Sequence, residues 1–426
     1  MTIQPTQMTQ TPQRIQTSVC VVGGGPAGLT LAVELARRNV PVVVLEASAH
    51  FNRSFRGESV SPDSVWLLDR LGLLDRLDGT YVQMHRMEID DSGHTVFQAE
   101  FADFRYPHPF PVELPQPTLL AALAEAGAAH PCFRLVQGAT ATALLRDAEG
   151  TVTGVRARTP DGETEIRAAL TVAADGRFSK VREMSGLTYR KVPLERDVIW
   201  LKLPFPYGDW DDRTYRVRIR GDQHGLFIPT RPDSVRVGFN IPKGGLRKMR
   251  AQGLPALYER LDLLAPELSK AVRESVHSWS DTSMLDIFTT VVPRWSMPGL
   301  TLIGDAAHTL TPILGQGVNH AIIDAVTLAP LVERALGDGG PGSAVPLLAA
   351  TEAFQREREA SVARSRALQL RQERLFTLDG ALGSAWRRTL YRVVSSSPWL
   401  TRKVLAGAYF QLQAPGERVA KVQAGT

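Results

Sequence analysis

Three glycines at a fixed spacing, Gly23, Gly25 and Gly28, constrain the fold of this chain more than any other feature. They lie between an apolar run at 17–22, which predicts a buried strand, and a helical pattern that leads to a second apolar run ending at Glu46. This order predicts a strand–turn–helix–strand unit. In such a unit the first glycine permits the tight turn, the second lets a pyrophosphate approach the backbone, and the third lets the helix pack closely on the strand.

The same unit predicts a site for a dinucleotide. The helix begins at the glycine loop, so its free amides and the positive end of its dipole would face the pyrophosphate. Glu46 lies 18 residues after Gly28, where a carboxylate can accept a hydrogen bond from a ribose 2′-hydroxyl. An acid here disfavours the 2′-phosphate of NADP, so the motif predicts NAD or FAD and does not choose between them. A glycine-rich turn without a ligand is the remaining alternative.

A second glycine loop lies some 290 residues further along the chain. Asp305 follows the apolar run LTLIG, so its carboxylate should project from the end of a strand, where it can bind the hydroxyls of a ribityl chain. Gly315 and Gly317 precede an amphipathic helix, whose dipole would stabilise a reduced, anionic flavin ring. NAD has no ribityl chain, so the two loops together favour FAD.

Size and composition exclude several classes of protein. Of the 426 residues, 43% are apolar and 22% are charged, as in ordinary globular proteins. No run approaches the ~18 apolar residues of a membrane span. Residues 1–16 are polar and are expected to be a disordered leader. Cys20 and Cys132 are too few for a disulfide framework or a metal cluster, so we expect no metal and a reduced, cytoplasmic protein.

The charge is unevenly distributed along the chain. From Pro346 to the end there are 13 Arg and Lys against 6 Asp and Glu, whereas the whole chain has a net charge of +5. A basic helical tail can meet an acidic carrier protein or a membrane surface. A solvated helix face is the simpler interpretation. No nucleic-acid-binding module is recognisable, so no nucleic-acid partner is expected.

The order of the patterns predicts an α/β fold that contains an inserted sheet. Strand and helix signals that fit one nucleotide-binding domain are interrupted by strands of period two between Val198 and Ile241, which predict an antiparallel sheet. The chain after the second glycine loop is mostly helical in pattern. The expected division is a discontinuous FAD-binding domain at 17–90, 116–190 and 285–336, a substrate-binding sheet domain at 91–115 and 191–284, and a helical C-terminal region at 346–426.

Alternate side chains of the inserted sheet should form one apolar face. Successive residues of a strand point to opposite faces, so the apolar positions of each strand are expected to point inward together. A face of this kind suits an aromatic or polycyclic guest. The candidate substrate-pocket residues are Tyr215, Val217, Val235, Val237 and Phe239, with Trp200 and His224 as further candidates for stacking or hydrogen bonding.

Three segments of the sequence resemble the signatures of a known family. VVGGGPAG, VAADGRFSKVR and LIGDAAHTLTPILGQGVNHAIIDA are similar to those of single-component FAD-dependent aromatic hydroxylases, the para-hydroxybenzoate hydroxylase-like group of class A flavoprotein monooxygenases. The resemblance extends from Thr17 to about Ala335. It implies a Rossmann-like FAD-binding domain of the GR2/PHBH type, FAD as cofactor, and NADPH or NADH as a transient reductant. One oxygen atom of O2 would enter an aromatic small molecule through a flavin C4a-(hydro)peroxide.

The resemblance also implies which residues contact the cofactor. Arg56 and Pro312 would lie beside the reacting groups, although this chain has Thr311 where many relatives carry a second proline. That difference leaves the shape of the cavity floor open. The implied cofactor contacts are Gly23, Gly25, Pro26, Ala27, Gly28, Glu46, Ala47, Arg56, Gln116, Asp175, Asp305, Gly315, Gly317, Val318 and Asn319.

Several alternatives remain open at this point. Baeyer–Villiger or epoxidising chemistry and a flavin dehydrogenase or reductase use the same cofactor, and a non-catalytic FAD-binding regulator is a different class. A flavin-dependent halogenase is disfavoured, because no lysine precedes Lys180 and no Trp-x-Trp-x-Ile-Pro segment occurs. The chain could be a monomer or a homodimer.

Overall fold

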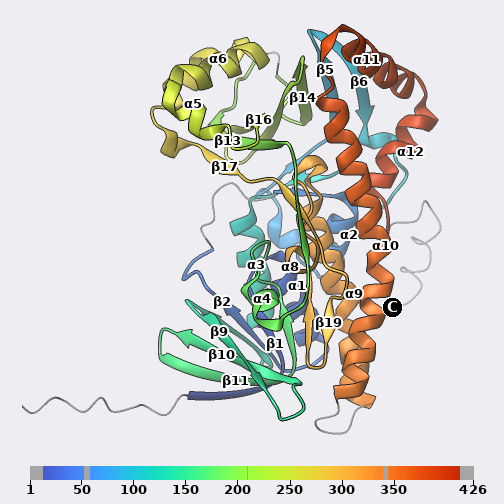
Figure 1. Ribbon diagram of the computed structural model, residues 1–426. Helices are drawn as coiled ribbons and strands as arrows, with labels where there is room; N and C mark the ends of the chain where they lie inside the picture. Colours follow the sequence, from blue (N-terminus) through green and yellow to red (C-terminus); the bar gives the residue numbers. More distant parts are fainter. Residues whose placement is uncertain (1–12, 52–57, 209, 339–343, 413–426) are drawn as a thin grey trace, which may run out of the picture.

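The computed structural model of this chain describes residues 13–51, 58–208, 210–338 and 344–412. Figure 1 shows a lower part built around one sheet, an upper part built around a second sheet, and the long helix α10 (Ala344–Phe376) running along one side of both. The predicted α/β class with a second sheet and a helical C-terminal region is confirmed. No helix in these ranges is both long enough and apolar enough to cross a membrane.

The lower sheet has eight strands within the described residues. Their bounds are β1 (Gln13–Val22), β2 (Val42–Glu46), β8 (Phe133–Gln137), β9 (Thr140–Arg146), β10 (Val152–Thr159), β11 (Gly162–Ala173), β19 (Ser296–Met297) and β20 (Leu300–Leu302). The order is β19-β20-β11-β1-β2-β8, with β10 and β9 continuing from β11. The pairs from β20 through to β8 are parallel, and β2 is buried throughout, as expected for a strand whose two faces are both covered.

Three of the helices that contribute side chains to the hydrophobic core of this lower part also position the site. They are α1 (Pro26–Arg37), α3 (Gln116–Ala128) and α9 (Gln316–Asp338). In Figure 1 they lie together above the sheet, so the beginnings of α1 and α9, far apart in sequence, both belong to one side of it. This arrangement brings the two glycine loops into the same region.

The first strand begins earlier than the sequence predicts. The expected leader covers 1–16, but β1 starts at Gln13 and residues 13–16 pair with β11. Their side chains are mostly exposed, which explains their polar composition. Main-chain hydrogen bonding therefore extends a strand into a segment whose composition alone suggested a leader. Residues 1–12 lie outside the described part of the chain.

The upper sheet has seven strands in the described residues. Their bounds are β5 (Arg86–Asp91), β6 (His94–Glu100), β13 (Arg196–Pro204), β14 (Thr214–Arg220), β15 (Gln223–Thr230), β16 (Ser234–Pro242) and β17 (Ser283–Leu285). The order is β17-β13-β16-β15-β14-β5-β6. One face packs on α6 (Leu254–Leu264) and α7 (Ser269–Ser275), and the other face contributes to a second core together with side chains of the C-terminal helices.

Two details of this sheet differ from the prediction. The sheet is not wholly antiparallel, because β14 and β5 run parallel. Residues 86–90, which the expected division assigns to the FAD-binding domain, belong to β5 and hence to the upper sheet. The cause is pairing with a strand more than a hundred residues away, which no local pattern in β5 reveals.

The C-terminal region forms three helices and closes over the upper sheet. They are α10, α11 (Gly380–Ser396) and α12 (Pro398–Tyr409). A fully buried ion pair between Arg387 Nε and Asp91 Oδ2 (2.9 Å) ties α11 to β5. Phe410, after α12, stacks on Phe104 and Tyr106 at centroid distances of 4.5 and 4.3 Å. The region was predicted to run to residue 426, and residues 413–426 lie outside the described range.

Short elements link the two parts. Three strands, β3 (Ser59–Val60), β4 (Val82–Gln83) and β7 (Val112–Glu113), form a small sheet, and β12 (Arg190–Pro193) pairs with β18 (Phe288–Val291). The remaining helices are α2 (Pro62–Arg70), α4 (Lys180–Ser185), α5 (Leu246–Gln252) and α8 (Asp305–His308), with short 3-10 turns at 75–77, 101–103, 266–268, 279–281 and 313–315.

Candidate functional site

A single cavity of about 770 Å³ connects the lower sheet, the upper sheet and the C-terminal helices. It gathers segments from the whole length of the chain, as expected for a site at the carboxyl ends of parallel strands. Arg56 lies outside the described residues. The predicted site residues that line the cavity are Gly23, Gly25, Pro26, Ala27, Glu46, Ala47, Gln116, Asp175, Asp305, Pro312, Gly315, Gly317, Val318, Trp200, Tyr215 and Val217. Those that do not line it are Gly28, Asn319, Val235, Val237, Phe239 and His224.

The three glycines of the first loop have different surroundings. A Cβ on Gly23 (φ +113°) would lie 2.3 Å from the carbonyl oxygen of Ala174, and one on Gly28 would lie 1.9 Å from that of Gly23. A Cβ on Gly25 would meet no protein atom within 4 Å. Gly23 and Gly28 are therefore required for packing, whereas Gly25 leaves room on the cavity side. Gly25 caps α1 without a side-chain bond, so the first amides of α1 remain available to an anion.

Glu46 joins this loop to the next strand. Its side chain is buried, and Oε2 accepts a hydrogen bond from the Gly24 amide while Oε1 accepts one from the Ser48 amide, both at 2.8 Å. These two bonds fix the carboxylate at the end of β2, on the cavity wall. That is the position in which a carboxylate can accept from a ribose hydroxyl.

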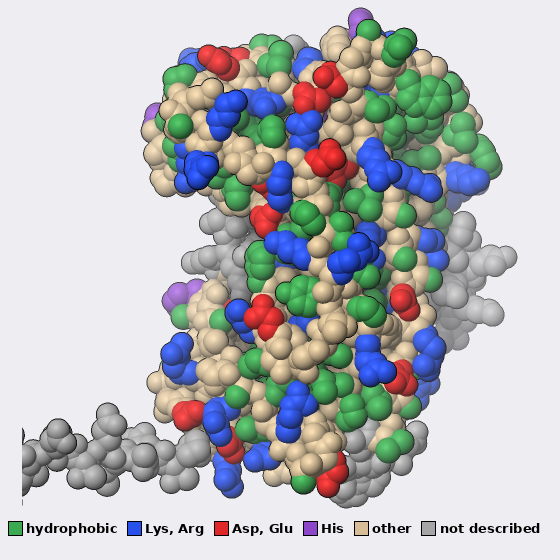
Figure 2. Space-filling view, viewed as in Figure 1, with side chains coloured by type: hydrophobic (Ala, Val, Ile, Leu, Met, Phe, Trp, Pro, Cys, Tyr) green, Lys and Arg blue, Asp and Glu red, His purple; other side chains and the backbone are tan. Residues whose placement is uncertain are grey.

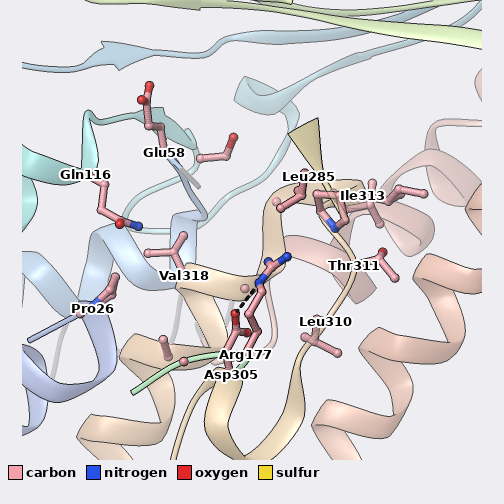
Figure 3. A pocket seen from close by; sticks show the side chains of 18 of the residues that line it. Pro26, Glu58, Gln116, Arg177, Leu285, Asp305, Leu310, Thr311, Ile313 and Val318 are labelled. Atoms are coloured by element: carbon pink, nitrogen blue, oxygen red, sulfur yellow. Dashed lines mark ion pairs between the residues drawn. The ribbon is translucent and has the colours of Figure 1, made fainter. Parts of the chain in front are cut away.

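The second loop begins at Gly304, where β20 ends. Asp305 starts α8 and pairs with Arg177 at 3.8 Å between Oδ2 and Nε. Figure 3 shows this pair in the middle of the cavity, with Gln116 and Val318 on one side and Leu310, Thr311 and Ile313 on the other. Asp305 thus faces the space between the two glycine loops.

A buried cluster of charged groups supports this loop from behind. Asp324 is fully buried and accepts hydrogen bonds from the Gly304 amide (2.8 Å) and from Arg358 Nε (2.8 Å), and its Oδ2 lies 2.7 Å from His308 Nε2. Burial alone would raise the pKa of Asp324, but His308 and Arg358 beside it hold that pKa well below its usual range. His308 therefore holds the loop in place and does not line the cavity.

The turn before α9 has an unusual backbone. Leu314 (φ +65°) and Gly315 (φ +60°) both adopt left-handed conformations, and a Cβ on Gly315 would lie 2.8 Å from that of Ser59. Gly317, like Gly25, has no protein atom near its Cβ position, and Val318 lines the cavity. Asn319 is buried away from the cavity. Its side chain accepts from the Ser61 amide (2.8 Å) and donates to the Gly315 carbonyl (2.9 Å), which fixes the turn.

The side chains of two further predicted contacts lie near the start of helices. Gln116 is the first residue of α3, is almost fully buried and lines the cavity. Asp175 follows β11 and accepts hydrogen bonds from Ser179 Oγ and from the Val181 amide (3.0 Å). Its carboxylate therefore stabilises the beginning of α4 while the residue itself lines the cavity.

The side chains that the upper sheet presents to the cavity agree only in part with the predicted set. Val217, Leu226, Gly238 and Trp200 are aligned across four neighbouring strands and lie on the cavity side. A Cβ on Gly238 would lie 2.7 Å from the Trp200 ring, so this glycine makes room for the indole. The guanidinium of Arg236 stacks over the same indole at 4.9 Å.

The placement of Val235, Val237 and Phe239 in the substrate pocket is wrong. All three are fully buried against side chains of α6 and α7, such as Leu257 and Val272, on the opposite face of the sheet. Both faces of this sheet are covered. An apolar alternation therefore marks a buried face of a strand but does not tell which of the two faces meets the cavity.

His224 also lies away from the main cavity. It lines a small neighbouring cavity with Glu373 and packs on the Phe376 ring at a centroid distance of 5.0 Å. Burial lowers the pKa of His224 to about 3, so it is neutral at physiological pH. Burial likewise raises the pKa of Glu373 to about 7.

The sequence did not predict a polar cluster on the cavity wall. Tyr215 Oη donates to Glu113 Oε1 at 2.8 Å, and Arg236 Nη1 lies 3.3 Å from Glu113 Oε2 and 3.2 Å from Glu58 Oε2. Ser59 also bonds the Glu113 carboxyl. Tyr215, Glu58 and Arg236 line the cavity, while Glu113 is fully buried behind them. Burial raises the pKa of Glu113 to about 7, although Arg236 beside it acts in the opposite direction.

The residues of this cluster carried only a weak signal in the sequence. Glu113 is a lone acid between apolar residues shortly before Gln116, and Arg236 occupies a polar position of an alternating strand, which usually faces solvent. The C-terminal wall of the cavity was missed as well. It is formed by side chains of α10, α11 and α12, among them Leu375, Tyr391 and Leu405.

The geometry fits FAD. Both glycine loops leave open space on the cavity side, at Gly25 and Gly317, and each lies at the beginning of a long helix. A carboxylate stands beside each loop, Glu46 at the first and Asp305 at the second. Among the described residues, no group of His, Cys, Asp or Glu is arranged to hold a metal ion. An apolar chamber under the upper sheet continues from the second loop.

Comparison with known proteins agrees with this fit. The family described as "FAD binding domain" matches residues 16–343. The chain is 33% identical over 384 residues to a 6-methylpretetramide 4-monooxygenase of Streptomyces rimosus, covering 90% of both chains. It is 30% identical over 342 residues to the 3-amino-4-hydroxybenzoate 2-monooxygenase PtmB3 of Streptomyces platensis, covering 76% of this chain and 81% of that one. The crystal structure of p-nitrophenol 4-monooxygenase PnpA from Pseudomonas putida shares the fold, with a TM-score of 0.77, 19% identity, and coverage of 94% of this chain and 100% of that one.

Proposed function

This chain belongs to the family of FAD-dependent aromatic monooxygenases related to para-hydroxybenzoate hydroxylase, and from this premise we propose that it hydroxylates a polycyclic aromatic small molecule. It is an oxidoreductase with FAD as its cofactor and NAD(P)H and O2 as co-substrates. The similarity to a 6-methylpretetramide 4-monooxygenase over nine tenths of both chains supports a polyketide-like aromatic substrate.

The observation that carries the proposal is the continuity of the cavity. One space joins the two glycine loops to a chamber walled by apolar side chains of the upper sheet, such as Ile89, Val217 and Leu226, and by side chains of the C-terminal helices. A substrate in this chamber would lie against the cofactor and away from water. Excluding water from the reacting groups is what oxygen transfer from a reduced flavin requires of the protein.

The residues around the two loops can hold FAD in one orientation. The amides at the start of α1 would bind the pyrophosphate, Glu46 the ribose and Asp305 the ribityl chain. The beginning of α9, with Gly317 and Val318, would face the flavin ring. When bound, FAD supplies the chemistry, since NAD(P)H reduces it and it then activates O2. The predicted contact of Arg56 remains part of the proposal.

The polar cluster gives the chamber one end that can bind and move a proton. A substrate hydroxyl placed against Tyr215 Oη can give its proton to that oxygen, while Tyr215 passes its own proton to Glu113 Oε1, 2.8 Å away. Loss of this proton makes an aromatic ring more electron-rich at the positions that are hydroxylated. The transfer neutralises Glu113 and leaves the negative charge on the substrate oxygen. Arg236, which lines the same cavity and lies within 3.3 Å of both Glu58 and Glu113, would help to compensate that charge.

Glu113→Gln is expected to reduce kcat/KM for a hydroxylated aromatic substrate by ~10–100-fold above pH ~7. The Glu113 carboxyl accepts a proton only when ionised, and its pKa is about 7, so kcat/KM of the unaltered enzyme should rise as the pH increases through that value. The variant should lose this rise, and Tyr215→Phe should behave in the same way. The measurement is kcat/KM against pH, together with the rate of FAD reduction by NAD(P)H.

Glu373→Gln is the matched control for this experiment. Glu373 is a second buried carboxyl whose pKa is raised to about 7, but it lines the small neighbouring cavity. Its substitution should leave the pH profile unchanged. If Glu113→Gln and the unaltered enzyme gave superimposable profiles, the proposed proton path would be wrong.

The function itself is tested by turnover under labelled oxygen. With NAD(P)H and candidate polycyclic phenols, we expect O2 uptake and one labelled oxygen atom in a product that keeps its carbon rings intact. A ring-expanded ester would indicate Baeyer–Villiger chemistry instead. NAD(P)H oxidation without incorporation of label would indicate a dehydrogenase or reductase.

A cytoplasmic location and a monomeric or homodimeric state are part of the proposal. Cys20 is a buried free thiol and Cys132 is a half-buried one, which is compatible with a reducing compartment. NAD(P)H is also available in that compartment. Fractionation of the producing cells and sedimentation of the purified protein would test the two statements.

A further inference from the structure

The outer surface of α11 and α12 is apolar to an unusual degree for helices at a protein surface. Leu382, Trp386 and Val393 on α11 are 88%, 60% and 52% exposed, and Trp399 and Val404 on α12 are 61% and 43% exposed. Figure 2 shows hydrophobic side chains gathered over this region, at the upper right, with Lys and Arg side chains beside them. We call this surface the C-terminal cap face and define it by these five residues and their basic neighbours Arg388, Arg392, Arg402 and Lys403.

These side chains are not exposed because α11 fails to pack on the protein, since its inner surface is buried. On α11 the inner surface carries the fully buried Arg387, which binds Asp91 Oδ2 at 2.9 Å and the Leu378 carbonyl oxygen at 2.6 Å. The outer surface carries Trp386, the residue next to it. Leu382, Trp386 and Val393 are spaced by four and seven residues, so they share one side of the helix. At this pair of positions the arginine is buried and the tryptophan is exposed, which is the reverse of the usual order in an amphipathic helix.

The charge of the cap face indicates what kind of partner it can meet. Between Gly380 and Leu412 the chain has five Arg and Lys and no Asp or Glu. The Lys403 ammonium lies 4.8 Å from the centre of the Trp399 ring, so a cation and an aromatic side chain form one surface unit. A second copy of the chain would bring like charges together across a twofold axis. An anionic partner is therefore favoured.

The cap face also lies directly over the cavity. Leu390 and Val394 of α11 and Val404 of α12 line the cavity from within, and Val404 is at the same time 43% exposed. Within the described part of the chain, α11 and α12 form the wall of the apolar chamber on this side. Tryptophan, aliphatic and basic side chains on one outward surface are the combination that binds the interface of a lipid bilayer.

We propose that the C-terminal cap face docks on the surface of an anionic lipid membrane. Its tryptophan, leucine and valine side chains enter the interface while its arginine and lysine side chains bind the lipid headgroups. The docking does not depend on the proposed reaction. The benefit of docking rests on the proposed function. It would place the chamber next to the lipid bilayer, in which polycyclic aromatic molecules dissolve.

Vesicle binding by the purified, FAD-loaded protein tests this proposal. The probes are vesicles of phosphatidylcholine alone and vesicles with about 30% phosphatidylglycerol. We expect co-sedimentation with the anionic vesicles at low ionic strength, a decrease as salt is raised, and at least ~10-fold weaker binding after Trp386→Ser with Trp399→Ser. Leu263→Ser is the matched control. Leu263 is a 49% exposed apolar residue on α6, and its substitution should leave binding unchanged.

A second measurement needs no substitution. In the unaltered protein, brominated lipid chains should quench tryptophan fluorescence only when the vesicles are anionic. Absence of binding to anionic vesicles, equal losses in the Leu263→Ser protein, or absence of quenching would overturn the proposal. A change of sedimentation coefficient from dimer to monomer in the double variant would show that a second copy covers this surface. Binding to an acidic carrier protein but not to vesicles would equally show that the partner is not a membrane.

Discussion

Gly25→Ala is expected to leave the chain folded without cofactor while weakening FAD binding by at least ~100-fold. The backbone of Gly25 is extended (φ −82°, ψ −175°), which alanine adopts without strain. The added methyl group would meet no protein atom within 4 Å. It would instead fill the space in front of the first amides of α1, where the pyrophosphate is expected. The measurement is FAD affinity by fluorescence titration, beside the unfolding midpoint of the apo protein.

Two other glycines provide controls for this result. A Cβ on Gly28 would lie 1.9 Å from a backbone oxygen, so Gly28→Ala should damage the fold itself and lower the unfolding midpoint. Gly337→Ala lies on α9 with no atom near its Cβ and should change neither stability nor FAD affinity appreciably. If Gly25→Ala bound FAD as tightly as the unaltered chain, the pyrophosphate would not lie at this loop.

Asp324→Ala is expected to lower the free energy of unfolding by ~3–5 kcal/mol, because it leaves three buried cationic or polar partners without their acceptor. Asp324 is fully buried and bonds Arg358, His308 and the Gly304 amide. Its loss should also loosen the loop that carries Asp305 and so weaken FAD binding. Urea unfolding measures the first effect and FAD titration the second.

The matched control is an ion pair of similar geometry at the surface. Asp262 and Arg273 lie 2.6 Å apart, but their side chains are 33% and 46% exposed. Asp262→Ala should cost only ~0–1 kcal/mol, since water solvates both groups after the change. A loss below ~1 kcal/mol for Asp324→Ala would contradict the role assigned to the buried cluster.

The contribution of Asp324 to the free energy of unfolding should decrease at acidic pH. Burial alone would raise its pKa, but His308 and Arg358 hold it well below the usual range. A carboxyl whose pKa is lowered in the folded state contributes its full stabilisation above pH ~4 and loses it as the pH falls further. The free energy of unfolding of the unaltered chain should therefore decrease below pH ~4, and the decrease should be smaller in Asp324→Ala.

The part of the site that depends on backbone sterics could be predicted from the sequence. Gly23 and Gly28 are glycines because any side chain would collide with a carbonyl oxygen a few residues or one strand away. Such a requirement is local, so it appears as a fixed spacing between a strand and a helix. For the same reason Glu46 and Asp305, each placed at the end of a strand beside a glycine loop, could be recognised before the structure was known. The predicted family, fold class and cofactor are confirmed by the comparisons.

The substrate side of the site depended on which strands pair and which face they turn to the cavity. Val237 and Val217 look alike in sequence, yet the register places one against α6 and α7 and the other over the cavity. Glu113 and Tyr215 meet across 102 residues of chain, and Arg387 meets Asp91 across 296.

The two glycine loops could therefore be recognised from the sequence alone, because steric exclusion and strand-to-helix order are encoded within a few residues. The polar cluster, the cavity-facing side of the upper sheet and the exposed cap face became visible only in the folded chain. Each of these depends on pairing between distant segments. A local pattern of apolar and polar residues shows that a side chain is buried or exposed, but not which partner covers it.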